Sequence, residues 1–322
     1  MAEYVCPNCG NRLLCDLNGK IVSSVKALDV HGKYTCSECG AELEQEQLKE
    51  LIAAAVQEYT VSTQLLQQAK NAKKSGDYET ASEYYQQLLN IDPTNWEAAF
   101  YSVCCNSWGC NVGGIDNACT AVKLCLDDVF DKLEALPKAQ KQTAVKLVVS
   151  DAGLFAVEKF DAAVRYHASL NASVMTQHNS ALKSQLISAL NVVIACSSLV
   201  MERFGNDSAI APLVEIPANV ALQMQSRQSF VSVVLEPETS RTLLEWIGRY
   251  NPGYVEEYKK KQNRSMASGT ILLIVLGAIF LALGLLLEGV FAKWFCIPMA
   301  AFCLLVGIFR IIVQAANKKL NG

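Results

Sequence analysis

The chain has 322 residues, of which 51% are apolar, and its formal net charge is −3, from 28 Lys and Arg against 31 Asp and Glu. This length leaves room for one large or two ordinary domains beside smaller modules. The near-balanced charge lacks the basic excess of nucleic-acid-binding proteins, so nucleic acid is not an expected partner. The first residues, MAEYVCPNCG, contain no apolar stretch, so no secretory signal peptide is expected.

Two Cys-x-x-Cys-Gly motifs lie near the N-terminus, separated by 26 residues. Cys6 and Cys9 belong to the first motif, and Cys36 and Cys39 to the second. Four thiolates from two such turns complete a tetrahedral Zn²⁺ site. The glycine that follows each pair suits a turn in which the backbone takes a positive φ. The sequence therefore predicts a structural zinc ion held by Cys6, Cys9, Cys36 and Cys39.

Between these motifs, short stretches at residues 12–17 and 20–28 flank Asn18-Gly19, which is a strong hairpin-turn signal. Residues 1–42 resemble a zinc ribbon, and the resemblance implies a small β fold stapled by metal. The first motif is also similar to the iron-binding turns of rubredoxins, which leaves a redox iron site as an alternative. Cys15 and His31 are expected to be bystanders, because four Cys already fill the coordination sphere. The ribbon has no cluster of cations, so a structural role is favoured over nucleic-acid binding.

Residues 43–136 change in composition to helix-forming Glu, Gln, Leu and Ala, which predicts a helical region. Within it, Gly76-Asp77-Tyr78 predicts a turn between two helices, and Asp92-Pro93 predicts the end of the second. Residues 63–95 resemble one 34-residue tetratricopeptide repeat, although Leu65 and Ala69 depart from the family pattern. Because one repeat cannot bury its own apolar face, further helices must pack against it.

The resemblance to a tetratricopeptide repeat implies a groove that binds a protein or peptide partner. The candidate contact residues in and after the repeat are Leu65, Ala69, Tyr78, Tyr85 and Trp96. Residues 137–258 are expected to continue as a helical bundle, with amphipathic helices at 138–169 and 174–204. A less regular stretch is expected between Pro212 and Pro217. Residues 220–235 are expected to form a further helix, with a strand at residues 230–235 as the alternative.

Five cysteines crowd residues 104–125, and a second metal or redox site is one interpretation of them. Their spacing fits no ligand pattern, and reduced Cys packs well as a small apolar residue. The packing interpretation is therefore favoured for Cys104, Cys105, Cys110, Cys119 and Cys125. A cytosolic location would also keep the thiols reduced.

Two long apolar runs end the chain. Residues 266–287 form an uncharged run of 22 residues, and residues 291–313 form a second run interrupted only by Lys293 and Arg310. About 20 apolar residues span a hydrocarbon core of roughly 30 Å as a helix. Long cationic side chains near a helix end reach the headgroups, and Trp294 lies where interfacial aromatics collect. The sequence predicts a transmembrane helical hairpin at 266–313, and a buried hairpin of a soluble core is the alternative.

A basic segment, residues 259–265, precedes the first run, and a short tail, residues 314–322, follows the second. Positive charge stays on the cytoplasmic side, so both chain ends are expected in the cytoplasm; in a bacterium the membrane would be the inner, plasma membrane. Four cations of the basic segment are expected at the membrane surface, namely Lys259, Lys260, Lys261 and Arg264. Gly277 and Gly284 favour close helix packing, either within the hairpin or between copies in a homo-oligomer.

No Ser-hydrolase elbow, zinc-protease motif or phosphate-binding Gly-rich loop occurs, so no enzymatic activity is expected. The expected fold class is mainly α: a small β zinc ribbon, an all-helical cytosolic domain and a transmembrane hairpin. The expected function is that of a membrane-anchored cytosolic adaptor with zinc as a structural cofactor. Two alternatives stay open: a regulator whose ribbon binds nucleic acid or senses metal or redox state, and an enzyme without short motifs.

Overall fold

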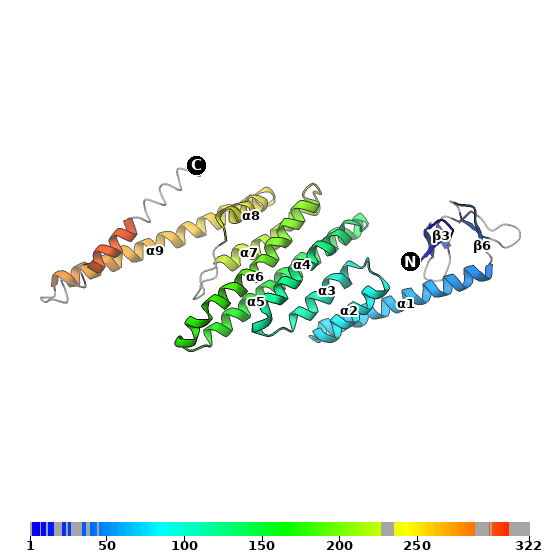
Figure 1. Ribbon diagram of the computed structural model, residues 1–322. Helices are drawn as coiled ribbons and strands as arrows, with labels where there is room; N and C mark the ends of the chain where they lie inside the picture. Colours follow the sequence, from blue (N-terminus) through cyan, green and yellow to red (C-terminus); the bar gives the residue numbers. More distant parts are fainter. Residues whose placement is uncertain are drawn as a thin grey trace. The chain divides into compact units, whose positions relative to one another are not determined.

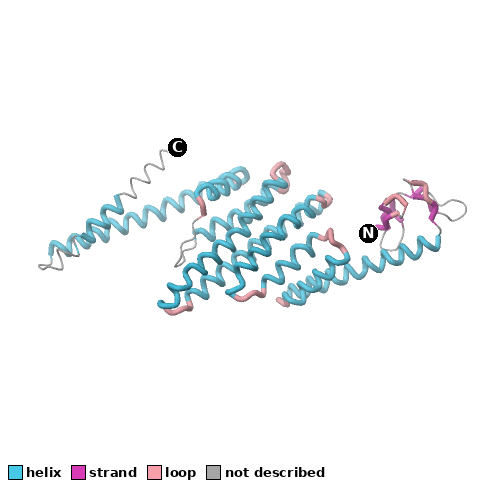
Figure 2. Tube along the Cα trace, in the orientation of Figure 1, coloured by secondary structure: helices cyan, strands magenta, loops and turns pink. Residues whose placement is uncertain are grey.

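The computed structural model of the chain describes residues 2–6, 8–10, 12–15, 21–23, 25–26, 34–36, 39–43, 45–226, 235–286, 296 and 298–308. Helices dominate these residues, and the strands among them lie near the N-terminus (Figures 1 and 2). The mainly α fold class is confirmed at this level. The chain divides into two compact units, Met1–Trp246 and Ile247–Gly322, which are described separately.

The N-terminal strands form two three-stranded antiparallel sheets. The first sheet contains β1 (Ala2–Val5), β2 (Arg12–Cys15) and β3 (Ile21–Ser23); the second contains β4 (Val25–Lys26), β5 (Tyr34–Cys36) and β6 (Glu42–Leu43). Each Cys-x-x-Cys-Gly motif forms the turn between two paired strands: the first joins β1 to β2, and the second joins β5 to β6. Strand β1 also contacts the first helix.

Helices α1 (Gln45–Ser75), α2 (Tyr78–Ile91) and α3 (Trp96–Trp108) follow one another with short turns. Gly76 has a φ of +81° between α1 and α2, a conformation that glycine adopts without strain. The Asp77 side chain accepts a hydrogen bond from the Thr80 backbone N–H at 3.2 Å and so caps α2. Asn95 caps α3 in the same way through the Ala98 N–H, at 3.0 Å. The turn predicted at residues 76–78 therefore lies where the sequence indicated.

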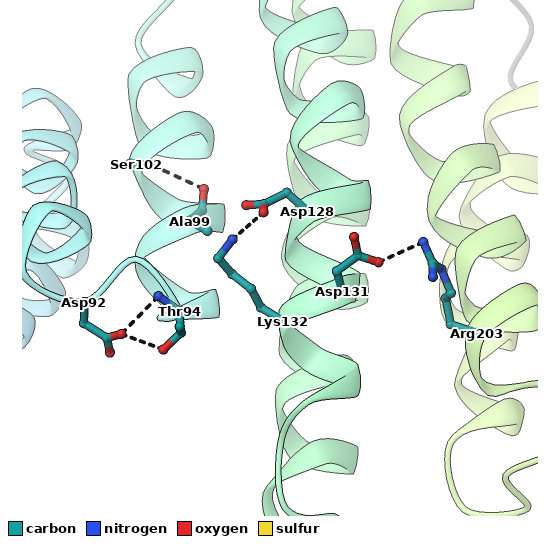
Figure 3. Close-up of polar contacts among 8 residues, drawn as sticks. All are labelled: Asp92, Thr94, Ala99, Ser102, Asp128, Asp131, Lys132 and Arg203. Carbon is teal, nitrogen blue, oxygen red and sulfur yellow. Dashed lines mark hydrogen bonds and ion pairs between the residues drawn. The ribbon is translucent and has the colours of Figure 1, made fainter. Parts of the chain in front are cut away.

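Four further helices follow in the first unit: α4 (Ile115–Glu134), α5 (Lys138–Ala168), α6 (Ala172–Phe204) and α7 (Glu215–Ser226). Each of α1 to α4 contacts the next, α4 and α5 both pack on α6, and α7 packs on α5 and α6. Gly153 of α5 faces Val220 of α7, and a Cβ at this position would make an ordinary van der Waals contact at 3.5 Å. Arg203 on α6 pairs with Asp131 on α4 at 2.8 Å, whereas Lys132 pairs with Asp128 within α4 (Figure 3).

An irregular stretch was expected between Pro212 and Pro217. This expectation is wrong for residues 215–217, which are helical. A short 3-10 turn, Ala211–Val214, contains Pro212, and α7 already begins at Glu215. Pro217 lies in the first turn of α7, where the missing N–H costs no intrahelical hydrogen bond. Helix α7 ends at Ser226, and the segment left open between helix and strand, residues 230–235, lies outside the described residues except for Leu235.

Helix α8 (Pro237–Tyr250) crosses the boundary between the two units, and α9 (Pro252–Leu286) follows it. Helix α9 is 35 residues long and continues without a break from the basic segment into the first predicted span. A short apolar helix, Pro298–Ile308, occupies part of the second predicted span. The predicted turn with Lys293 and Trp294, the end of the second span with Arg310, and the tail lie outside the described residues.

Candidate functional site

Three of the four predicted metal ligands come together at the N-terminus. The sulfur atoms of Cys6, Cys9 and Cys39 lie within 4.8 Å of one another, and Cys6 Sγ lies 3.8 Å from Cys39 Sγ. Sulfur ligands about 2.3 Å from a zinc ion stand about 3.8 Å apart in a tetrahedron. The thiol cluster Cys6–Cys9–Cys39 therefore has a spacing that fits a tetrahedral metal. Among the described residues, these three cysteines are the one group of His, Cys, Asp or Glu side chains close enough together to hold a metal ion.

The backbone of both turns also follows the prediction from the sequence. Gly10 has a φ of +74° and Gly40 a φ of +66°, so each motif turns back on itself at its glycine. The Gly10 N–H donates to the Cys6 carbonyl oxygen at 2.9 Å, which closes the first turn. The backbone of Cys36 ends β5 directly before the second turn, but its side chain lies outside the described part of the structure. The same holds for the side chains of Cys15 and His31.

Three of the five cysteines of residues 104–125 pack as buried thiols, and Cys110 and Cys125 are half-buried. Cys104, Cys105 and Cys119 are at most 1% exposed. Burial raises the pKa of Cys105 to about 11 and the pKa of both Cys119 and Cys125 to about 12. Thiols with such pKa values stay protonated at neutral pH, and the thiolate is the form that binds metal or attacks. Their environment supports the packing interpretation over a redox role.

The predicted partner-contact residues fall into two groups. Ala69 and Tyr85 are fully buried where α1, α2 and α3 meet, so they support the helices from inside. Leu65, Tyr78 and Trp96 are half-buried, and Tyr78 stacks on Trp108 with ring centroids 5.3 Å apart. Of the five predicted contact residues, only Leu65, Tyr78 and Trp96 reach the surface. Partner binding at these positions stays a prediction.

A polar network that the sequence did not indicate joins α1, α3 and α5. Asp151 Oδ2 accepts hydrogen bonds from Lys73 Nζ at 2.8 Å and from the Tyr101 hydroxyl at 2.7 Å. Lys73 Nζ also lies 3.5 Å from the centre of the Tyr101 ring. Burial and the neighbouring Asp151 carboxylate raise the pKa of Tyr101, so its phenol stays a hydrogen-bond donor. This network holds three helices together, since each of them supplies one partner.

A second polar contact lies one heptad further along α3 and α5. Trp108 Nε1 donates to Glu158 at 2.7 Å, and the buried Lys159 ammonium donates to the Trp108 carbonyl oxygen at the end of α3. A cation at a helix C-terminus satisfies an unpaired carbonyl and favours the helix dipole. The same seven-residue step separates Tyr101 from Trp108 and Asp151 from Glu158, so α3 and α5 run parallel here.

The C-terminal unit contains an antiparallel contact between two apolar helices. A Cβ on Gly277 of α9 would lie 2.9 Å from Leu304 Cγ, and a Cβ on Gly307 would lie 3.3 Å from Ile274 Cγ1. Buried side chains at this contact are small, namely Cys296, Ala300 and Cys303. Leu304, which lies against Gly277, is half-buried. Seven other large apolar side chains are 37–67% exposed, namely Ile274, Val275, Leu276, Ile279, Phe302, Leu305 and Ile308. Gly277 thus serves packing within one chain.

Among the described residues, one helix, Ser173–Phe204, is long and apolar enough to cross a membrane. Half of its most apolar stretch is buried, and it packs against α4 and α5, as the core helix of a soluble domain does. The four predicted surface cations, Lys259, Lys260, Lys261 and Arg264, are all exposed on α9.

Comparison with protein-family models, with curated proteins and with solved structures finds no significant match to this chain.

Proposed function

We propose that this protein is a membrane-tethered cytosolic adaptor. The observation that carries the proposal is the inverted packing of the C-terminal helices, with small residues inside and large apolar residues outside. In water such a surface would cost free energy, at about 25 cal/mol per Å² of exposed apolar area. In a bilayer the lipid chains cover large apolar side chains, and small residues let two helices approach. Helix α9 and the helix Pro298–Ile308 would form the transmembrane hairpin.

The basic segment before the hairpin gives the orientation. Lys259, Lys260, Lys261 and Arg264 precede the first span, and Lys318 and Lys319 follow the second. Positive charge is retained on the cytoplasmic side, so both termini would be cytoplasmic. The helical unit and the N-terminal sheets would then face the cytosol, where thiols stay reduced.

Zinc would be held by Cys6, Cys9 and Cys39 together with Cys36, whose backbone directly precedes the second turn. The ion would supply a structural cross-link and no reaction step. The two sheets are too small to bury a core of their own, and metal coordination replaces core in such folds. Loss of the metal would be expected to unfold the sheets.

The helical unit would bind a protein or peptide. Its support is the resemblance of residues 63–95 to a tetratricopeptide repeat and the half-exposed Leu65, Tyr78 and Trp96. Anchoring to a membrane raises the local concentration of such a domain for partners at the same surface without any new contact.

The experiment that tests the tether is flotation of full-length protein with lipid vesicles after an alkaline wash. The protein is expected to float with the vesicles, and a variant ending at residue 258 is expected to stay in the aqueous fraction. Release of the full-length chain by the wash would contradict the proposal. Partner binding is tested by capture in mild detergent, where a Leu65→Gln, Trp96→Gln variant with unchanged thermal unfolding is expected to lose proteins that the wild type retains.

A further inference from the structure

The polar half of α9 carries a cluster of exposed cations directly before its apolar half. We infer that the basic segment of α9 is a binding site for anionic phospholipid headgroups, and not only a signal for orientation. This inference rests on the proposed function, since it places α9 in a membrane. It adds a ligand of stated chemistry: a phosphate-bearing, net-negative lipid such as phosphatidylglycerol in the leaflet that the basic segment faces.

The cations of the basic segment lie close above the start of the apolar run. Helix α9 has no break, so each residue adds about 1.5 Å along one axis. Counted from Met266, Arg264 lies about 3 Å and Lys261 about 8 Å above the start of the apolar run. The headgroup layer is about 5–7 Å thick on each side of the hydrocarbon core. Arg264 therefore lies within this layer, and the flexible Lys261 side chain can reach down into it.

The cations of the basic segment are free to bind a lipid headgroup. Lys259, Lys260, Lys261 and Arg264 are exposed, and none of them forms an ion pair with any residue in the described part of the chain. Lys260, Lys261 and Arg264 lie within an arc of about 100° around the helix, because successive residues are rotated by about 100°. Three charges thus share one face and can meet the same headgroup.

The acidic residues nearest to these cations lie further from the headgroup layer. Glu256 and Glu257 are exposed one turn before the lysines, at about 14–15 Å above the start of the apolar run. That height places them about one Debye length beyond the headgroup layer at physiological salt, so they repel the lipid weakly. They offer a matched control, because their removal changes the net charge of the segment without removing a contact to lipid.

The experiment uses the full-length protein in vesicles of equal parts phosphatidylcholine and phosphatidylglycerol. After extraction in mild detergent, native mass spectrometry counts the lipids of each kind that stay bound. The wild type is expected to retain phosphatidylglycerol preferentially. Each cation near the surface is worth about a fivefold preference. Arg264→Gln is therefore expected to reduce retention by about fivefold and Lys259→Gln by less, because Lys259 lies higher.

The control variant Glu256→Gln, Glu257→Gln is expected to retain at least as much phosphatidylglycerol as the wild type. Equal retention of both lipids by the wild type, or unchanged retention after replacing all four cations with Gln, would overturn the inference. Displacement by inorganic phosphate beyond that by chloride of equal ionic strength would assign the site to free phosphate and overturn it too. Flotation of the same samples separates these results from failure of the tether, because a protein that does not float contradicts the proposed function itself.

Discussion

At the scale of single residues, the polar contacts inside the helical unit connect positions far apart in the chain. Lys73 and Asp151 are separated by 78 positions, and Trp108 and Glu158 by 50. Neither pair has a local sequence signal, since a charged residue on a helix is by itself most simply a solvated one. The glycines of the two Cys-x-x-Cys-Gly turns are the opposite case. Their positive φ follows from local chain geometry, so the sequence predicted them.

Replacing Asp151 tests the network that joins α1, α3 and α5. Asp151→Leu removes the acceptor of Lys73 and leaves the buried Tyr101 hydroxyl without a partner. The expected loss is about 2–4 kcal/mol of unfolding free energy, measured by urea denaturation followed by circular dichroism. The ionic part of this loss is small, because Lys73 and Asp151 are partly exposed and solvent screens them. Asp127→Leu, on the exposed face of α4, is the control and is expected to change stability by less than about 0.5 kcal/mol.

The buried thiols predict a loss of stability at alkaline pH. Burial raises the pKa of Cys196 from 9.0 to about 12. Between these values the unfolded chain has released this proton and the folded chain has kept it, so stability falls as the pH rises. One such thiol contributes a slope of about 1.4 kcal/mol per pH unit. The Cys196→Ala variant is expected to show a slope shallower by that amount between pH 9 and 12, and an identical slope would contradict the burial of the thiol.

At the scale of elements, the long helices were the most predictable part of the chain. The apolar period of α5 and α6 gave both helices to within about two residues at each end. The start of α7 was missed because proline serves both as a helix breaker and as a first-turn residue, and only the packing on α5 and α6 decides between the two. Strands β1 and β6 are too short to show an alternating pattern.

The two turns of the thiol cluster adjoin β1, which contacts α1, and β6, which α1 follows in the chain. Strand β1 contacts α1 and leads directly into Cys6, whereas β6 follows the second turn and is next to the start of α1. The proposed zinc ion between the turns would therefore close a loop that holds β1 against α1. Chelation is expected to raise hydrogen exchange in β1 and in the first half of α1, with α5 unchanged. Cys9→Ser is expected to act like chelation and Cys110→Ser is not, and equal exchange with and without metal would contradict the link.

The contact at Gly277 tests the packing of the apolar helices. A larger side chain at Gly277 has no room, because Leu304 and the Ala300 carbonyl oxygen lie against it. Gly277→Leu is expected to separate the helices and expose Cys303, which is 7% exposed in the intact protein. Maleimide labelling of Cys303 in detergent should then be faster by about tenfold or more, as expected when a buried thiol becomes accessible. Ala278→Leu, at an exposed position of the same helix, is the control and should label at the wild-type rate.

At the scale of the whole molecule, the two units differ in what covers their apolar surface. The first unit buries large side chains such as Phe100, Phe130 and Phe155 in a core, although Leu124 and Leu154 are exposed on its surface. The second unit shows large apolar side chains outside. The sequence predicted an apolar hairpin at residues 266–313, since an uncharged run of 22 residues has few uses in a soluble core. The partner of the helical unit could not be predicted, because recognition depends on a surface assembled from several helices.

This division predicts different solution behaviour for the two units. A chain ending at Trp246 retains the first unit, including the apolar helix Ser173–Phe204. It is expected to be monodisperse in buffer without detergent, measured by size-exclusion chromatography with light scattering, because α6 is covered by α4 and α5. The full-length chain is expected to need an amphiphile. Aggregation of the shorter chain with native-like circular dichroism would indicate that α6 too requires lipid.

The unbroken course of α9 has a mechanical consequence. A helix without a hinge between its polar and apolar halves behaves as a stiff lever, so a tilt imposed at one end is passed to the other. If α9 crosses a bilayer as proposed, a force exerted on its polar half would change the angle of its apolar half in the membrane. Conversely, a change in bilayer thickness, which alters the preferred tilt of a spanning helix, would move the polar half.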